Sequence, residues 1–201
     1  LENIYRAGIK LKTDTDHTKS ILNNIRQHAI HVAEEREKYG RLLDIATEHF
    51  NRTLETLEER CHDPHESPEN LLKSVETSVH DVLTVCADFE KAVIDKDIIR
   101  NARVRFHEKT NPILSKSFCI NRTRTWPQGM QGDYKTLEII YRNTPLSEGI
   151  GYYLDVGFLN APLAVGVRNR IKKLEELLRS ELKERNQPAI LNIACGSCRE
   201  L

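Results

Sequence analysis

The first hundred residues carry apolar positions at helical spacing. One stripe comprises Ile21, Leu22, Ile25, Ala29, Val32, Ala33, Tyr39, Leu42, Leu43, Ala46, Phe50, Leu54 and Leu57. Residues three or four positions apart share one face of an α-helix. The pattern therefore predicts one very long amphipathic helix, or two helices separated near Gly40. Residues 1–16 hold few apolar anchors and are predicted to be a polar lead-in segment, with Asp16 or Thr18 capping the helix.

A second amphipathic helix is predicted after the loop CHDPHESPEN, where two prolines stand among polar residues. We expect it to start at Ser67 or Asn70, to run as far as Phe106, and to be ended by Asn111-Pro112. Its apolar positions are Leu71, Leu72, Val75, Val79, Val82, Leu83, Val85, Cys86, Phe89 and Val93. Residues 17–110 are thus predicted to form an antiparallel helical hairpin or bundle. Such long stripes need a partner, either within the chain or in a second copy, so a homodimer through the long helices is expected.

The pattern changes after Pro112. SFCINRTRTWPQGMQGDY reads as irregular, YKTLEIIYRN as a short helix, and APLAVGVRNRIKKLEELLRSELKERN as a long helix that Gln187-Pro188 breaks. The final AILNIA reads as a short buried strand that leads into a glycine turn. Residues 111–188 are therefore predicted to be a helical cap or linker region, and residues 189–201 a first strand and glycine turn.

Composition narrows the classes of protein. Charged residues make up 30% of the 201 residues and aromatic residues 6%, which is typical of a helix-rich soluble protein. The 30 basic and 30 acidic residues balance, which disfavours nucleic acid or anionic lipid as a partner. No apolar run approaches the roughly 18 residues of a membrane span, and no signal-peptide pattern opens the sequence. Five scattered cysteines are unlike a secreted disulfide framework, so a cytoplasmic location is expected.

The closing ILNIACGSCREL has the pattern of a cofactor-binding turn, although a buried strand followed by a glycine turn is also common. Small residues after a strand let the backbone approach a ligand, and free N–H groups of a following helix face it. Cys195 and Cys198 also have the spacing of a redox pair. The rest of a thioredoxin domain is missing and Ala194 replaces its usual aromatic residue, so two ordinary small residues are the favoured interpretation.

Three stretches in order, RTWPQGMQGDYKTLEIIY, GIGYYLDVGFLNAPLAVGVRNRI and ILNIACGSCREL, carry a family resemblance. They resemble class I S-adenosylmethionine-dependent methyltransferases, and more narrowly a bacterial subgroup with a long helical N-terminal region. That subgroup includes enzymes described as making 3-hydroxypalmitic acid methyl ester. The resemblance covers residues 112–201. It implies a Rossmann-like α/β domain, S-adenosylmethionine as cofactor, and methyl transfer to a small or fatty-acid-type oxygen or carboxyl acceptor.

The resemblance also implies site residues. Ala194, Gly196, Ser197 and Cys198 would line the cofactor, the first three through their backbone. The substrate-side candidates are Tyr134, Tyr152, Tyr153, Asp155, Arg168 and Arg170. Arg168 or Arg170 would pair with an acceptor carboxylate. For Tyr152 and Tyr153, simple packing between helices is an equally open alternative, and no catalytic residue is assigned.

The turn departs from the family pattern at three positions. Asn192 stands at the usual acidic position, Ala194 replaces the first glycine and Cys198 the third. The acidic residue that binds the cofactor ribose, and the remaining strands, would lie beyond Leu201. The chain also opens on Leu1 rather than methionine, so we expect a truncated N-terminal part of the enzyme that is inactive by itself. The expected fold is mainly α: a helical bundle followed by the entry segment of an incomplete Rossmann-like domain.

Three alternatives remain. The long helices are also consistent with a non-enzymatic module for dimerisation or regulation. Cys61-His62 and His65-Glu66 could bind a metal, but no second ligand pair stands at zinc spacing, so a solvated loop without metal is predicted. Basic and aromatic residues mix at Arg122, Arg124, Trp126 and Lys135, as in proteins that bind single strands. Overall neutrality favours a tryptophan plug whose flanking arginines pair with the helices.

Overall fold

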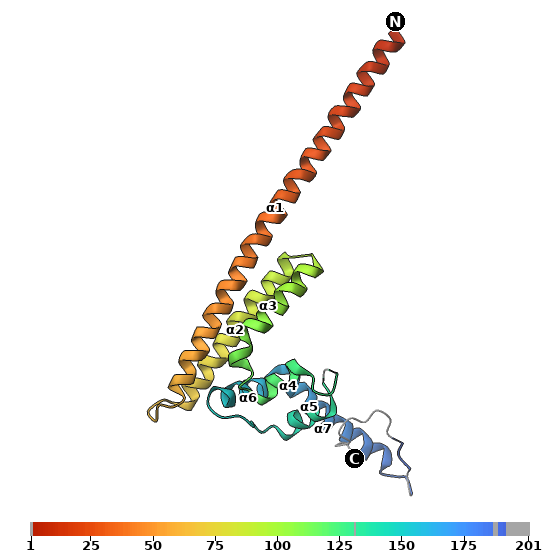
Figure 1. Cartoon of the computed structure of the whole chain (residues 1–201). Helices are drawn as coiled ribbons and strands as arrows, with labels where there is room; N and C mark the ends of the chain where they lie inside the picture. The colour runs from red at the N-terminus through yellow and green to blue at the C-terminus, as the bar shows by residue number, and fades with distance from the viewer. Residues whose placement is uncertain (1, 131, 187–188, 192–201) are drawn as a thin grey trace.

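The computed structural model describes residues 2–130, 132–186 and 189–191, and over these residues it is helical without any strand (Figure 1). The helices are α1 (Glu2–Arg60), α2 (Pro68–Ala92), α3 (Lys96–Leu114), α4 (Phe118–Thr125), α5 (Tyr134–Arg142), α6 (Ile150–Asn160) and α7 (Pro162–Leu182). No single described helix is long and apolar enough to cross a membrane, and α6 and α7 meet the length and composition criteria only as a pair bent by 54°.

The predicted entry segment of an α/β domain is wrong over the described residues. Residues 189–191 have no regular secondary structure. Ile190 and Leu191 are 47% and 86% exposed instead of buried. A strand needs a neighbour that takes up its backbone hydrogen bonds, and the described part of the chain offers no strand to pair with. The glycine turn at 192–201 lies outside the described residues.

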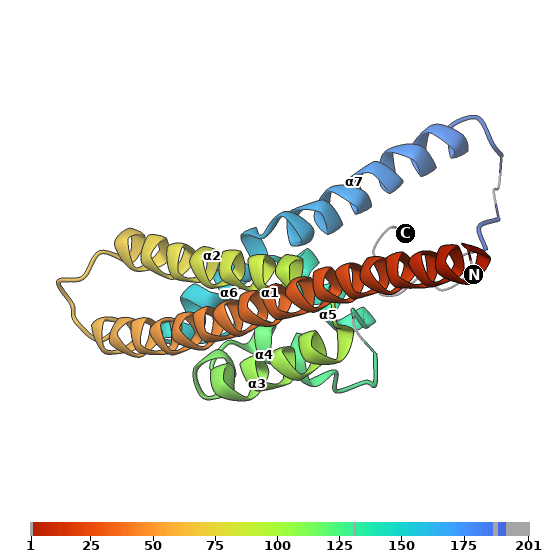
Figure 2. The same ribbon diagram turned by 90° about the horizontal axis from the view of Figure 1, so that it is seen from above.

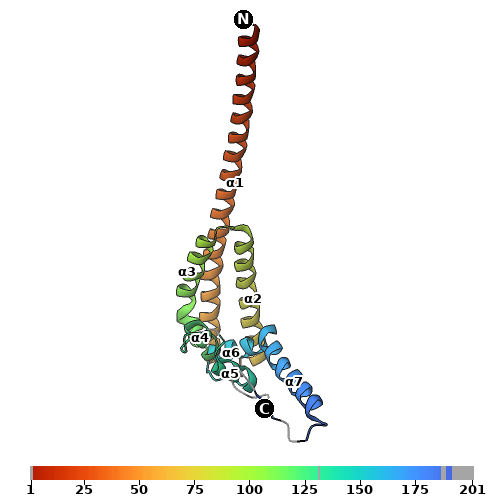
Figure 3. The same cartoon turned by 90° about the vertical axis from the view of Figure 1, so that its right-hand side faces the viewer.

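Helix α1 is one continuous helix of 59 residues, roughly 90 Å long at the usual rise per residue. It passes through Gly40 without interruption, since a single glycine costs a helix only about 1 kcal/mol. It also begins at Glu2, so the predicted helix start with a cap at Asp16 or Thr18 is wrong. Its first half extends beyond the other helices, whereas α2 and α3 flank its second half (Figures 1 and 3).

The predicted start of α2 is confirmed. The Ser67 hydroxyl accepts a hydrogen bond from the Asn70 N–H at 3.4 Å, and Pro68 occupies the first turn. Helix α2 then runs antiparallel to the second half of α1 (Figure 2). It ends at Ala92 instead of continuing to Phe106. A new helix, α3, begins there because the Asp95 carboxylate caps its free N–H groups.

Two further boundaries differ from the sequence prediction. Pro112 does not end α3, which continues to Leu114, because a proline near the end of a helix removes only one hydrogen bond. The stretch expected to be irregular contains α4, whose first turn is capped by the Ser117 hydroxyl at 3.0 Å from the Ile120 N–H. The predicted short helix, α5, is confirmed and ends at Asn143, which has a left-handed backbone (φ 51°). The predicted long helix is α7.

The main core lies where α1, α2, α3 and α6 meet. Its buried residues are Phe50, Leu54, Leu57, Leu71, Val75, Val82, Ile113, Leu114, Ile150 and Leu154. The second half of α1 and α2 form a helical hairpin. A smaller cluster lies at the end of this hairpin nearest the α2–α3 connection, and consists of Leu43, Phe89, Val93 and Ala102. The hairpin therefore provides one wall of the core, and α6 lies across its base (Figure 1).

Glu58, near the end of α1, attaches α6 to the hairpin. Its Oε2 accepts a hydrogen bond from the Ile150 N–H at 2.9 Å, and its Oε1 accepts one from Lys116 Nζ at 2.8 Å. The carboxylate thus meets the first free N–H group of α6, at the positive end of the helix dipole. Burial raises the pKa of Glu58, but the bonds from Lys116 and Ile150 outweigh it and lower the pKa below its ordinary value.

The close approach of α6 to the α3–α4 turn requires a glycine at position 151. A Cβ there would lie 2.3 Å from the backbone oxygen of Lys116. Gly151→Ala is therefore expected to lower the free energy of unfolding by roughly 1 to 3 kcal/mol, measured by urea denaturation. The matched control is Gly157→Ala in the same helix, where nothing lies within 4 Å. This control should be neutral or stabilising by up to about 1 kcal/mol. Equal stabilities for the two variants would contradict the packing described.

Candidate functional site

Asp155, in the middle of α6, is a predicted substrate-side residue whose carboxylate is fully buried (0% exposed). Its Oδ1 accepts hydrogen bonds from the Ser117 hydroxyl at 2.5 Å and from the Cys119 N–H at 3.0 Å. Its Oδ2 accepts from the N–H groups of Leu146 and Ser147 at 3.0 and 3.1 Å. One carboxylate therefore joins the α3–α4 turn, the loop after α5, and α6. We call this the Asp155 network.

These hydrogen bonds and the burial of the site determine the protonation of Asp155 and Cys119. Burial raises the pKa of Asp155, but the hydrogen bonds to its charged form together lower the pKa below its ordinary value. Burial, followed by the charge of Asp155, raises the pKa of the Cys119 thiol to about 12. Cys119 is therefore a neutral thiol and a poor nucleophile. The role of Asp155 towards a substrate stays a prediction, and the contacts described here make it a positioning residue.

The three predicted tyrosines lie on two helices. Tyr134 begins α5 and is 44% exposed, and Tyr152 on α6 is 45% exposed. Tyr153 is half-buried against the main core. The rings of Tyr152 and Tyr153 meet edge to face, with their centroids 5.3 Å apart. Packing accounts for the position of Tyr153, and the other two rings remain accessible to a ligand.

The two predicted arginines contact neutral groups. Arg168 Nη1 donates to the backbone oxygen of Leu159 at 2.8 Å, at the end of α6. Arg170 Nη2 lies 3.4 Å from the Tyr141 hydroxyl. Neither arginine lines a cleft described below together with a predicted tyrosine, so the structure does not gather these candidates into one cavity. The predicted cofactor residues, Ala194, Gly196, Ser197 and Cys198, lie outside the described residues and stay a prediction.

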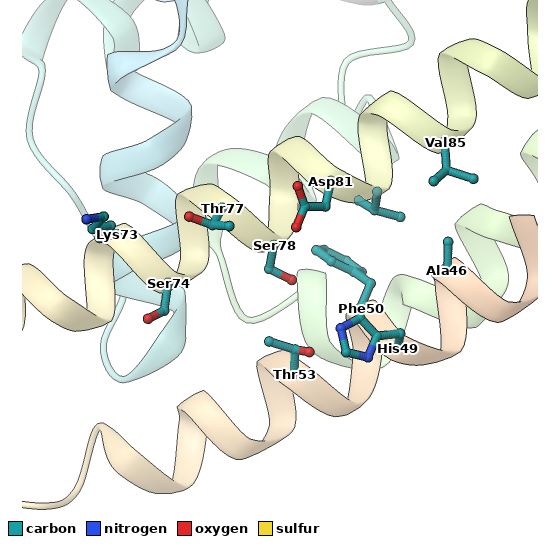
Figure 4. Close-up of a pocket in the computed structure, with 11 residues that line it drawn as sticks. Ala46, His49, Phe50, Thr53, Lys73, Ser74, Thr77, Ser78, Asp81 and Val85 are labelled. Carbon is teal, nitrogen blue, oxygen red and sulfur yellow. The ribbon is translucent and has the colours of Figure 1, made fainter.

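A cleft of about 500 Å³ opens between α1 and α2 (Figure 4). Phe50 lies between the two helices, with His49 and Thr53 beside it on α1 and the hydroxyls of Ser74 and Ser78 on α2. The charged lining residues, Lys73 and Asp81, have opposite signs. The lining therefore selects neither an anion nor a cation, and it indicates no particular chemistry.

A second cleft has a defined electrostatic character. This α3–α4 cleft measures about 760 Å³ and is lined by Lys96, Ile99, Arg100, Arg103, Val104, His107, Glu108, Arg124 and Trp126. It adjoins an inner slot of about 190 Å³, which is lined by Leu43, Cys86, Phe89, Glu90, Ile99, Ala102, Arg103, Phe106, His107 and Arg124. Ile99, Arg103, His107 and Arg124 belong to both. A mainly apolar slot thus opens into a mainly basic cleft.

The arginines of α4 differ in their partners. Arg122 Nη2 lies 2.7 and 2.8 Å from the two carboxylate oxygens of Asp133, the cap of α5. The hydrogen bond from Arg122 is the largest cause that lowers the pKa of Asp133. Arg124 instead donates to the Thr110 hydroxyl at 3.1 Å and to the backbone oxygen of His107. The predicted pairing of these arginines with helices is confirmed.

Trp126 is not the predicted plug. It is 44% exposed on the α3–α4 cleft, and its indole N–H donates to the backbone oxygen of Thr123 at 2.6 Å. Its backbone is left-handed (φ 45°) because it ends the short helix α4, which carries the side chain outward. Among the residues that the structure describes, no group of three or more His, Cys, Asp or Glu side chains could hold a metal ion.

Residues 90–201 match the model of a protein family described as "Putative methyltransferase". The match covers more than half of the chain, and the chain therefore belongs to this methyltransferase family. It takes in α3 to α7, and with them the Asp155 network and Arg124, while α1 and nearly all of α2 lie outside it. No curated protein and no solved structure matches the chain.

The Asp155 network predicts an acid-sensitive stability. Because its folded-state pKa is lowered, Asp155 contributes stability above its unfolded pKa of about 3.9, and this contribution is lost as the pH falls further. Asp155→Asn turns an amide towards N–H donors and should lower the free energy of unfolding by roughly 2 to 4 kcal/mol near pH 7. The difference from the wild type should narrow below about pH 4 in urea denaturation.

The matched control is Asp88→Asn, because Asp88 is exposed and forms an exposed ion pair with Lys91 at 3.3 Å. It should stay within about 0.5 kcal/mol of the wild type throughout. A stability difference between Asp155→Asn and the wild type that does not change with pH would contradict the charged network.

Proposed function

We propose that this chain takes part in S-adenosylmethionine-dependent methyl transfer to a small acceptor with an oxygen or carboxyl nucleophile, of the fatty-acid type. The single observation that supports this is the family match, which spans α3 to α7 and the glycine turn. The composition of the predicted turn supports the same proposal, because Gly196 and Ser197 are small residues of the kind that let a backbone approach a cofactor. The class I assignment and the 3-hydroxypalmitic acid methyl ester subgroup belong to the same proposal.

The bound cofactor would supply an activated methyl group to the attacking oxygen. The chain would hold the acceptor in line and exclude water, since methyl transfer depends mainly on positioning. The Asp155 network supports that task because it fixes α6 against the α3–α4 turn. A cytoplasmic location goes with this proposal, because the described cysteines Cys61, Cys86 and Cys119 are free thiols.

Binding of S-adenosylmethionine tests the proposal. In equilibrium dialysis with the protein expressed from its complete gene, Gly196→Val should weaken binding by about tenfold or more, because a branched side chain would occupy the space beside the ligand. Gly166→Val, at an unobstructed position of α7, is the matched control and should keep wild-type affinity. Equal affinity of the two variants, or failure of the wild type to bind, would contradict the proposal.

A second candidate function, self-association through α1, rests on a separate observation. The projecting half of this helix exposes five large apolar side chains by 43% to 60%: Ile21, Leu22, Ile25, Ile30 and Val32. Leu22, Leu43 and Phe50 are separated by multiples of seven residues and therefore lie on the same face of α1. Leu43 and Phe50 are buried in clusters to which α2 and α3 contribute. The stripe is therefore buried where α2 and α3 flank the second half of α1 and exposed at these five positions, in the part of α1 that projects beyond the other helices (Figure 3).

We propose that a second copy of the chain covers this stripe. Residues 17–33 include Lys19 and Arg26 but no carboxylate, and in the stretch that follows Glu34, Glu35 and Glu37 alternate with Arg36 and Lys38. The charges therefore do not set the orientation of the two helices, and pairing of two copies brings the apolar stripes together. It also removes apolar surface that a lone helix in water would leave exposed.

Sedimentation equilibrium of the chain tests this pairing. The wild type should be a dimer, and Ile25→Glu should be monomeric because it places charge within the apolar stripe. Gln27→Glu adds the same charge on the opposite face of the helix and should remain dimeric. A monomeric wild type, or equal association of the two variants, would contradict the proposed pairing.

A further inference from the structure

We propose that the inner slot and the α3–α4 cleft form a binding site for an amphipathic monocarboxylate. The alkyl chain of the ligand would enter the slot, and its carboxylate would pair with Arg124. This site stands on the helices alone and does not depend on the methyl-transfer proposal.

The first argument is the uncompensated charge of Arg124. The acceptors described for its guanidinium are a hydroxyl and a backbone oxygen, both neutral, and its Nε is buried without a hydrogen-bond partner. No carboxylate of the described residues lies within ion-pair distance of it. A partly buried guanidinium is usually paired, because removing an ion from water is costly unless an opposite charge compensates it. Burial accordingly lowers the pKa of Arg124.

Neighbouring arginines are each paired with a carboxylate. Arg122 has Asp133, and Arg103 donates to both carboxylate oxygens of Glu90 at 2.8 and 2.9 Å. Glu90 lines the inner slot, but its negative charge is thus already neutralised. Arg124 therefore retains an uncompensated positive charge at the junction of the slot and the cleft. A bound carboxylate would supply the missing charge.

The second argument is the apolar character of the inner slot. Its walls come from Leu43 on α1, Phe89 on α2, and Ile99, Ala102 and Phe106 on α3. Protein interiors are normally packed without such spaces, and the atoms that line an open slot lose van der Waals contacts. An alkyl chain would restore them. A mainly apolar cavity with a few converging polar groups is also the usual form of a small-molecule site.

The third argument is the basic lip of the cleft. Lys96 and Arg100 stand on the first turns of α3 and line the same cleft as Trp126. Glu108 is the acidic residue of the lining. The excess of basic over acidic residues in the lining favours the approach of an anion. One uncompensated guanidinium next to an apolar slot matches a ligand with one charge and one alkyl chain, more closely than a phosphate or a nucleotide.

Trp126 provides the experiment with its signal, because it is the only tryptophan of the chain and lies on the cleft. Fluorescence titration of the whole chain with octanoate should give a saturable change. Octanol and octylamine, which have the same alkyl chain without the negative charge, should bind at least about tenfold more weakly. Equal binding of octanol and octanoate, or no binding of octanoate, would overturn the proposal.

Two variants test whether Arg124 binds the carboxylate of octanoate. Arg124→Gln should weaken octanoate binding by about tenfold or more, whereas Arg179→Gln, which changes an exposed arginine on α7, should leave it unchanged. Without ligand, Arg124→Gln should melt within a few degrees of the wild type, because it removes an uncompensated charge together with three hydrogen bonds to two neutral acceptors. Octanoate should raise the melting temperature of the wild type but not that of Arg124→Gln. Unchanged octanoate affinity in Arg124→Gln would overturn the proposal.

Ala102→Val gives an independent test should Arg124→Gln fail to fold. It narrows the slot and leaves the guanidinium in place. Octanoate affinity should fall by about tenfold in this variant, while the weak binding of acetate, which has no chain to bury, should not change. Equal losses for acetate and octanoate, or no loss for octanoate, would show that the slot is not the site.

Discussion

The structure depends on one buried ion. The carboxylate of Asp155 lies in the interior, where a charge is tolerated only if its hydrogen-bonding capacity is satisfied. Ser117 and Cys119 come from the start of α4, and Leu146 and Ser147 from the loop before α6. None of these segments can move away without leaving the charge uncompensated. The segments between α3 and α6 therefore form one unit.

A second carboxylate joins this unit to the hairpin. Glu58 on α1 holds both the first N–H group of α6 and Lys116 in the α3–α4 turn. The region that matches the methyltransferase family is thus fixed to a helix that precedes the match. The hairpin also contributes to the proposed carboxylate site, because Arg124 donates to α3, α3 packs against α1 and α2, and the inner slot has walls from all three helices.

Sequence patterns predicted the elements whose signals are local. The apolar stripe and the cap at Ser67 specified the start of α2, and apolar spacing specified α5 and α7 nearly in full. The boundary between α2 and α3 was missed because apolar spacing continues across it, although Asp95 is a readable cap. The strand at 189–191 was wrong, since its apolar run carries no information about a pairing partner. The environments of Asp155 and Arg124 could not be predicted, because the partners of Asp155 are up to 38 positions away and the missing counterion of Arg124 is a property of the folded chain.

Native-state hydrogen exchange measured by NMR tests the central claim most directly. The amides of Leu146 and Ser147 lie in a loop, where exchange is normally fast. If the Asp155 carboxylate binds them, they should exchange as slowly as the amides in the middle of α6, and with the same free energy of opening. Exchange of these two amides at the rate of an open loop, while α6 remains protected, would contradict the account.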